Sequence, residues 1–134
     1  MMLIWIYSIW IVFALISGLL EAYYFSAVYN KVINKASYVH EKFTLVRGLV
    51  AVCILYLFTG ITWQVLFIGA SLMVIFPFFH DGVYYMTRNK LDGVYPLGFR
   101  DHSTTSDAKF NFDYNQRWWL VWFGFLLFII QFAI

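Results

Sequence analysis

Residues 61–90 read ITWQVLFIGASLMVIFPFFHDGVYYMTRNK, and this stretch decides the fold. Its first part, residues 61–79, carries no charged side chain, and His80 and Asp81 then end the apolar run. Spanning a bilayer as an α-helix takes about 20 apolar residues. The stretch therefore predicts a transmembrane helix that continues past its apolar part, to about residue 90, as a polar extension.

The same division runs through the whole chain, because all its acidic and basic side chains fall within residues 21–47 and 81–117. Of the 134 residues, 63% are hydrophobic and 12% are charged, whereas soluble domains average about 25% charged residues. Three further apolar segments, residues 2–20, 43–59 and 118–134, are long enough to span a bilayer. The sequence therefore predicts an all-α integral membrane protein with four transmembrane helices in a single domain.

We expect the helices at about residues 2–34, 38–59, 61–90 and 117–134, with a polar loop at residues 91–116. The first and third helices are expected to extend into the cytoplasm, because their patterns run on beyond the length that a bilayer requires. A structureless loop longer than about 12 to 15 residues is uncommon. The long loop should therefore contain a short helix or lie against the membrane.

The basic residues predict the orientation. Every Lys and Arg lies within or beside the loops that join the first helix to the second and the third to the fourth. Such residues mark cytoplasmic loops, so both termini should lie outside, in a bacterial inner membrane or an equivalent membrane. The net charge of +2 is too small to indicate a nucleic-acid partner.

Several potential ligands should lie at one depth. His40 precedes the expected turn between the second and third helices by as many residues as His80 follows it, and Glu41 and Asp81 come next to them. A helix rises 1.5 Å per residue, so these side chains should share a level about 30 Å below that turn. Glu21 reaches the same level if the first helix begins at the outer surface.

This set of side chains predicts a metal site. Imidazoles and carboxylates suit Zn, Mn or Fe, and the expected ligands are Glu21, His40, His80 and Asp81. Consecutive side chains on a helix diverge by about 100°, so the ligands must come from different helices. The alternative is a hydrogen-bonded polar plug that only holds the helices together, and the sequence leaves both interpretations open.

Two arginines complete a candidate catalytic set. Arg47 or Arg88 would hold an anionic phosphate or carboxylate, the metal would activate water, and Glu41 or Asp81 would accept a proton. An isolated cation inside a membrane costs about 2.5 to 3.5 kcal/mol on insertion scales, so Arg47 should have a carboxylate partner, with Glu21 as one candidate. The set predicts an interfacial hydrolase or transferase that acts on membrane lipid or a lipid-linked substrate.

A different class of function fits the same composition. The protein could be a non-enzymatic homo-oligomer, such as a pore, a holin-like assembly or a scaffold, in which the polar cluster is structural. In general layout the chain resembles small four-helix membrane enzymes with a cytoplasm-facing site, such as the eicosanoid and glutathione metabolism family. Residues 39–51 lack that family's Glu-Arg and Asn-containing pattern, so the resemblance assigns no catalytic residue.

Overall fold

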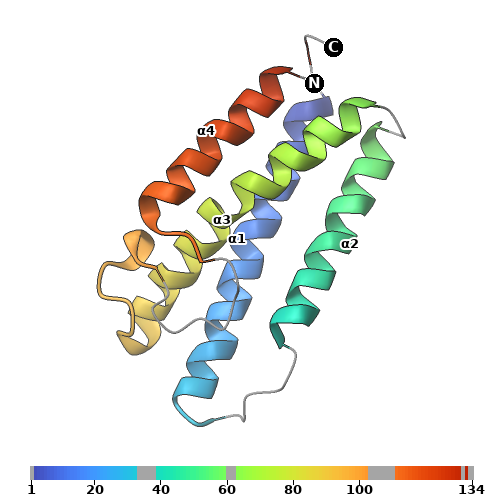
Figure 1. Cartoon of the computed structure of the whole chain (residues 1–134). Helices are drawn as coiled ribbons and strands as arrows, with labels where there is room; N and C mark the ends of the chain where they lie inside the picture. Colours follow the sequence, from blue (N-terminus) through green and yellow to red (C-terminus); the bar gives the residue numbers. More distant parts are fainter. Residues whose placement is uncertain (1, 33–38, 60–62, 103–110, 131, 133–134) are drawn as a thin grey trace.

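A computed structural model describes residues 2–32, 39–59, 63–102, 111–130 and 132, without the side chains of residues 39–41, 58–59 and 63. Within these residues the protein is all-α, with four α-helices and no strand, as predicted. The elements in chain order are α1 (Met2–Tyr29), α2 (Val39–Thr59), α3 (Trp63–Asp92), the short 3₁₀ helix η1 (Gly98–Arg100) and α4 (Tyr114–Ile130) (Figure 1).

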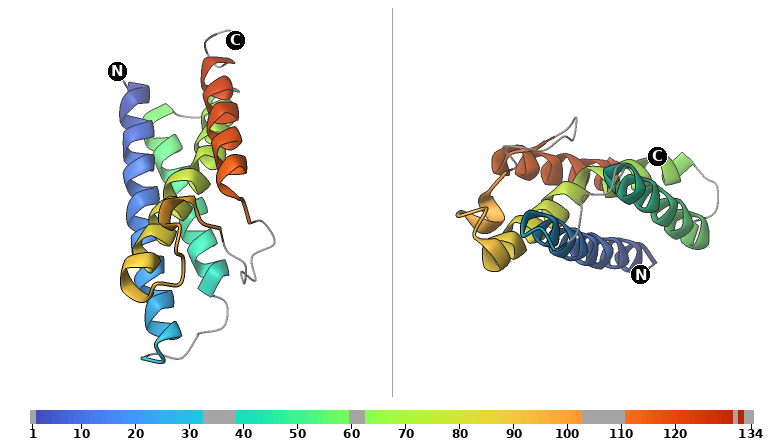
Figure 2. Two further views of the ribbon diagram at one scale, coloured as in Figure 1. Left: turned by 90° about the vertical axis from the view of Figure 1, so that its left-hand side faces the viewer. Right: turned by 90° about the horizontal axis from the view of Figure 1, so that it is seen from below.

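Helix α3 is the centre of the arrangement and runs obliquely across the other helices (Figure 1). Helices α1 and α4 both pack along it, whereas α2 makes far fewer contacts, with α1 and α3. The start of α1, the end of α2, the start of α3 and the end of α4 lie at one end of the molecule (Figures 1 and 2). The C-terminal ends of α1 and α3 lie toward the opposite end of the molecule.

Helices α1 and α3 are the long ones, with 28 and 30 residues, against 21 for α2 and 17 for α4. Helix α3 continues through Pro77, although proline cannot donate the backbone hydrogen bond of that turn. By length and hydropathy, α1 and the stretch Gln64–Asp92 of α3 are the described helices that could cross a membrane.

Helix α1 ends earlier than the predicted residue 34. Lys31 has a φ of 59°, its amide donates to the carbonyl of Val28 at 3.1 Å, and the amide of Val32 donates to the carbonyl of Ala27 at 2.9 Å. This pair of bonds is the Schellman motif, which usually has glycine at the left-handed position. Because lysine takes the place of the usual glycine, the sequence carries no recognisable signal for the end of the helix.

Helix α4 begins at Tyr114 rather than at residue 117. The amide of Gln116 donates to Asp113 Oδ1 at 2.8 Å, and the amide of Asp113 donates to Gln116 Oε1 at 2.9 Å. This reciprocal pair is a capping box, which satisfies two amides at the helix start. Arg117 consequently lies within the first turns of the helix and not before it.

The hydrophobic core lies between α1 and α3, with a smaller contribution from α2. Trp10 is fully buried, and its indole Nε1 donates to the carbonyl oxygen of Leu72 at 2.6 Å. The buried side chains of this core are Ile6, Trp10, Ala14, Ala51, Ile54, Ile68, Leu72, Ile75 and Phe76. Because the core holds α1 firmly against α3, it fixes the relative positions of the polar side chains on these two helices.

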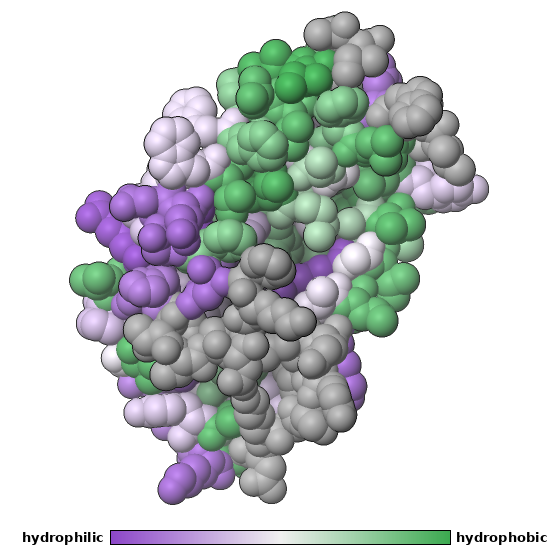
Figure 3. Space-filling model, viewed as in Figure 1, coloured by the Kyte–Doolittle hydropathy of each residue, from purple (hydrophilic) through white to green (hydrophobic). Residues whose placement is uncertain are grey.

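The outer surface is largely apolar. Large exposed hydrophobic side chains occur on every α-helix, with Ile4 at 70%, Leu57 at 75% and Trp119 at 74% of their full exposure. In Figure 3 hydrophobic residues cover most of the upper part of the visible face, and hydrophilic residues gather toward its left and lower parts. The visible face therefore has a broad apolar upper part, with more hydrophilic residues beside and below it.

Candidate functional site

The site begins where α1 comes closest to α3. A Cβ atom on Gly18 would lie 2.3 Å from the carbonyl oxygen of His80, so the two backbones can approach this closely only because position 18 is glycine. Glu21, one turn further along α1, places its Oε2 at 2.7 Å from His80 Nε2. Both residues are buried, at 3% and 5% exposure. The close contact between Gly18 and the His80 backbone thus brings the Glu21 carboxylate and the His80 imidazole together as a buried pair.

The second ring nitrogen of His80 also faces a carboxylate, because its Nδ1 lies 2.7 Å from Asp81 Oδ1. The imidazole ring stacks on Phe76 with centroids 5.0 Å apart and lies near-parallel to Tyr84 at 6.5 Å. Two aromatic rings and two carboxylates therefore fix both the position and the rotation of the imidazole.

Helix α2 contributes Arg47 to the same cluster. Its Nη2 donates to Glu21 Oε2, forming an ion pair, and lies 2.7 Å from His80 Nε2. The guanidinium also lies over the Phe76 ring, 5.0 Å from its centroid. The structure thus gives Arg47 the carboxylate partner that its predicted depth required, and three helices meet at this point. We call Glu21, Arg47, His80 and Asp81 the polar cluster.

The contacts of the His80 ring limit where protons can lie in the polar cluster. Each ring nitrogen of His80 faces a carboxylate oxygen at 2.7 Å, and such a contact is favourable only with a proton between the two atoms. A neutral imidazole carries a proton on one nitrogen alone. An imidazolium, or one protonated carboxyl, would satisfy both contacts. Nε2 also lies 2.7 Å from Arg47 Nη2, which can only donate, so an N–H on Nε2 would face another donor.

The chain from Asp81 through His80 to Glu21 leads from the surface inward. The side chain of Asp81 is 24% exposed, that of His80 is 7% exposed and that of Glu21 is 4% exposed. Hydrogen-bonded groups in this order can take up a proton at the exposed carboxylate and shift the charge to the buried one. This arrangement is suited to general acid–base chemistry.

Arg88 lies apart from the polar cluster, although the sequence analysis placed it in the same candidate catalytic set. Its Nε donates to Asp92 Oδ2 at 2.6 Å, and its Nη1 donates to the Tyr84 hydroxyl at 3.0 Å. The side chain is buried. The Tyr84 ring lies between Arg88 and His80. The Nε and Nη1 groups of Arg88 already donate hydrogen bonds within the protein.

Sequence reasoning missed the role of Arg117, which it treated only as a marker of topology. Arg117 is completely buried, and its Nη2 donates to the carbonyl oxygens of Phe99 and Asp101 at 2.7 and 2.8 Å. The Phe99 ring occupies the space that a Cβ on Gly82 would need, at 2.1 Å. The loop around η1 is thereby fastened to both α3 and α4. The Asp113-to-Gln116 capping pattern was the available signal that the helix begins before Arg117.

The other predicted site residues stand as follows. His40 and Glu41 lie on α2, but their side chains are outside the described ones, so their roles stay predictions. Among the described residues, no group of three or more His, Cys, Asp or Glu side chains could hold a metal ion. The ring nitrogens of His80 face Glu21 and Asp81 instead. A Zn, Mn or Fe site that includes His80 would require this hydrogen-bonded arrangement to open.

No family model, curated protein or solved structure matches the chain. Its chemistry must therefore be inferred from the geometry of the polar cluster and its surroundings.

Proposed function

We propose that the protein is a four-span integral membrane protein that carries out acid–base-assisted hydrolysis or group transfer on a lipid or lipid-linked substrate. The membrane part of the proposal is supported by the large apolar side chains exposed on all four helices. Soluble monomers rarely expose contiguous apolar patches above a few hundred Å². The basic loops favour an orientation with the polar cluster near the cytoplasmic surface and both termini outside.

The observation that carries the catalytic part is the Asp81–His80–Glu21 chain. Asp81 is its accessible end, so this carboxylate would take the proton of an attacking water or substrate hydroxyl. His80 and Glu21 would redistribute the charge away from the reacting atoms. Arg47, whose side chain is 20% exposed, would hold an anionic phosphate or carboxylate of the substrate.

A metal-dependent form of the reaction stays within the proposal. It would use His40 as a ligand from α2 beside Glu21, His80 and Asp81, with Glu41 as a nearby base. In that form the metal would activate water, and Arg88 could serve only after release from Asp92 and Tyr84. Elemental analysis of the protein purified without a histidine tag tests this form. A transition metal bound in wild type and lost from a folded His40→Ala, His80→Ala variant would favour it.

The direct test is turnover of phospholipids and lipid-linked phosphates by the protein in vesicles. His80→Ala and Asp81→Asn should each lower turnover by about 100-fold or more, the usual contribution of a general acid or base. His102→Ala is the matched control, because His102 is exposed and, like His80, is next to an aspartate in sequence. Wild-type turnover no higher than that of empty vesicles, or full activity in His80→Ala, would rule out the enzyme.

One observation favours a second function. The polar cluster ties α1, α2 and α3 together, so its role could be purely structural in a pore, a holin-like assembly or a scaffold. That function predicts a stable homo-oligomer in detergent, conductance in planar bilayers, and loss of assembly rather than loss of turnover in His80→Ala. A monomer without conductance would exclude the pore.

A further inference from the structure

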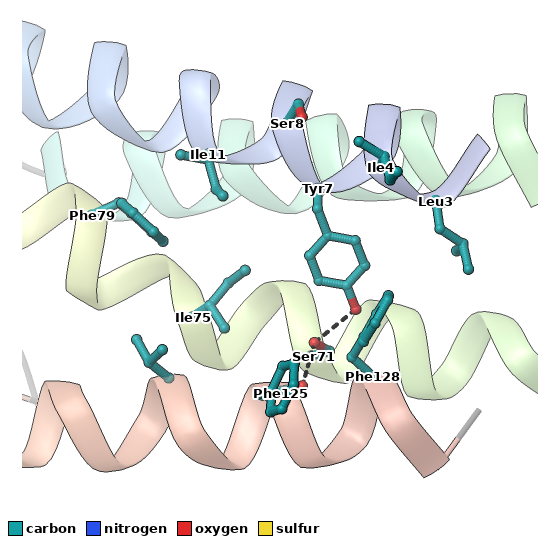
Figure 4. Close-up of a pocket in the computed structure, with 12 residues that line it drawn as sticks. Leu3, Ile4, Tyr7, Ser8, Ile11, Ser71, Ile75, Phe79, Phe125 and Phe128 are labelled. Carbon is teal, nitrogen blue, oxygen red and sulfur yellow. Dashed lines mark hydrogen bonds between the residues drawn. The ribbon is translucent and has the colours of Figure 1, made fainter. Parts of the chain in front are cut away.

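A groove runs between α1 and α4, with α3 along its floor (Figure 4). Its volume is about 360 Å³, which lies within the usual range of about 300 to 1,000 Å³ for small-molecule sites. The residues that shape it include Leu3, Ile11, Ile75, Val121, Phe125 and Phe128. The close-up shows side chains from all three helices directed into the same space (Figure 4).

The buried polar groups of the groove are satisfied by the protein itself. The Tyr7 hydroxyl donates to Ser71 Oγ at 2.8 Å, and the Ser71 hydroxyl donates to the carbonyl oxygen of Gly124 at 2.7 Å (Figure 4). Among the described residues that line the groove, none is charged. A bound water molecule needs two to four polar partners, so this lining favours a hydrocarbon occupant.

The groove is continuous with the exposed apolar surface. Ile4 on one rim is 70% exposed, and Phe125 on the other is 52% exposed. A hydrocarbon chain can therefore enter sideways from a surrounding membrane without passing a polar barrier.

One end of the groove leads toward charge. On α3, the lining residue Phe79 is followed by His80 and Asp81, and on α4 the lining residue Val121 has Arg117 one turn before it on the same face. Arg117 is fully buried, yet its Nε and Nη1 have no hydrogen-bond partner in the described part of the chain. The rings of Tyr85, Phe99 and Tyr114 cover the guanidinium, at 5.4 to 5.8 Å from its Cζ. An anionic group that supplies the missing acceptors must therefore move at least one of these rings aside.

From these observations we infer that the groove binds the acyl chain of an anionic membrane lipid, with the headgroup toward Arg117. The inference goes beyond the proposed function, in which Arg47 holds the reacting anionic group. Here Arg117, on a different helix, would hold the headgroup charge of the bound phospholipid. The apolar lining would bind the acyl chain, and Arg117 Nε and Nη1 would favour a negatively charged headgroup.

Native mass spectrometry with added phosphatidylglycerol or phosphatidylcholine of identical chains tests the inference. Wild type should retain one phosphatidylglycerol per chain, at least about tenfold more tightly than phosphatidylcholine, a difference of about 1.4 kcal/mol. Ser8→Trp fills the groove from its rim and should weaken retention by a similar factor. Val12→Trp, at a 52% exposed position that does not line the groove, introduces the same side chain and should bind like wild type.

Equal retention by Ser8→Trp and wild type would overturn the groove as the site, and equal retention of both lipids would overturn the headgroup assignment. If Ser8→Trp does not fold, a second groove variant, Ile11→Trp, replaces it and should weaken lipid retention by a similar factor. A doubled mass without lipid, lost in Ser8→Trp, would assign the groove to a second copy and overturn the inference. Lipid retention by His80→Ala would support lipid binding in the groove independently of catalysis. Lipid retention by a wild type that shows no turnover would support the groove as a lipid site and contradict the proposed enzyme activity.

Discussion

Helices α1 and α2 both flank α3, yet they are held in different ways. Helix α1 approaches α3 so closely that Gly18 lies against the backbone of His80, and it buries a line of side chains from Ile6 to Ser26. Among the described side chains of α2, Ala51 and Ile54 are the buried ones. Its polar tie to the other helices is Arg47, which reaches Glu21 and His80. Packing therefore fixes α1, whereas charge contributes much of the attachment of α2.

The largest effect should follow from removing the carboxylate that serves both helices. Glu21→Ala leaves Arg47 and His80 without their buried partner, and breaking a buried pair in this way costs about 3 to 5 kcal/mol. Thermal unfolding in detergent measures the loss. Glu21→Ala combined with Arg47→Met should recover part of it, because the unpaired cation is gone. An unchanged midpoint in Glu21→Ala would mean that the polar cluster contributes nothing to stability.

The next effect tests the packing of α1. Gly18→Ala places a Cβ against the backbone of His80, and such overpacking costs about 1 to 3 kcal/mol. Gly48→Ala is the matched control on α2, where a Cβ would meet nothing within 4 Å. It should instead stabilise its helix by about 0.5 to 1 kcal/mol. If both variants shift the unfolding midpoint in the same direction, the two helices do not differ in the way described.

A smaller and local effect should follow from Arg47→Met. Glu21 keeps its contact with His80, and Arg47 is partly exposed, so we expect a loss of about 1 to 2 kcal/mol. Amide hydrogen exchange should become faster in α2 while α1 and α3 keep their protection. Lys42→Met, at an exposed position of the same helix, should leave exchange unchanged. Faster exchange throughout the protein would show that α2 is not a separate unit.

The smallest effect concerns the α3–α4 side. Ser71→Ala removes the hydroxyl that joins Tyr7 to the carbonyl of Gly124, at a cost of about 1 kcal/mol. Ser8→Ala, at an exposed position, serves as the control for thermal unfolding. If Ser71→Ala lost more stability than Gly18→Ala, the Ser71 hydrogen bonds would matter more to the fold than the contact between Gly18 and His80.

Much of the fold could be predicted from sequence because hydrophobic length and charge segregation are local signals. The helix ends were less predictable. A lysine at the left-handed position ended α1 early, and a capping box started α4 before the apolar run begins. Both depend on a few backbone hydrogen bonds that hydropathy does not register.

Sequence reasoning anticipated the shared level of Glu21 and His80 and the Glu21 partner of Arg47, but not the partners of Arg88 and Arg117. Counting residues along helices brought Glu21 and His80 to one level, and the structure places them in contact. The same count could not show that Gly18 lets the two helices touch, since helix rotation depends on tertiary packing. Arg88 and Arg117 illustrate the limit most clearly. Their hydrogen bonds to Asp92, Tyr84 and loop carbonyls arise from side-chain directions that spacing alone does not fix.

The Phe99 ring that fills the space above Gly82 has an evolutionary consequence. A side chain at position 82 would displace the ring, and with it the carbonyl oxygens that hold Arg117. Positions 82 and 99 should therefore change together in related sequences, with a larger residue at 82 accompanied by a smaller one at 99. Where such pairs are found, their covariation would show that the loop around η1 and helix α3 are selected as one unit.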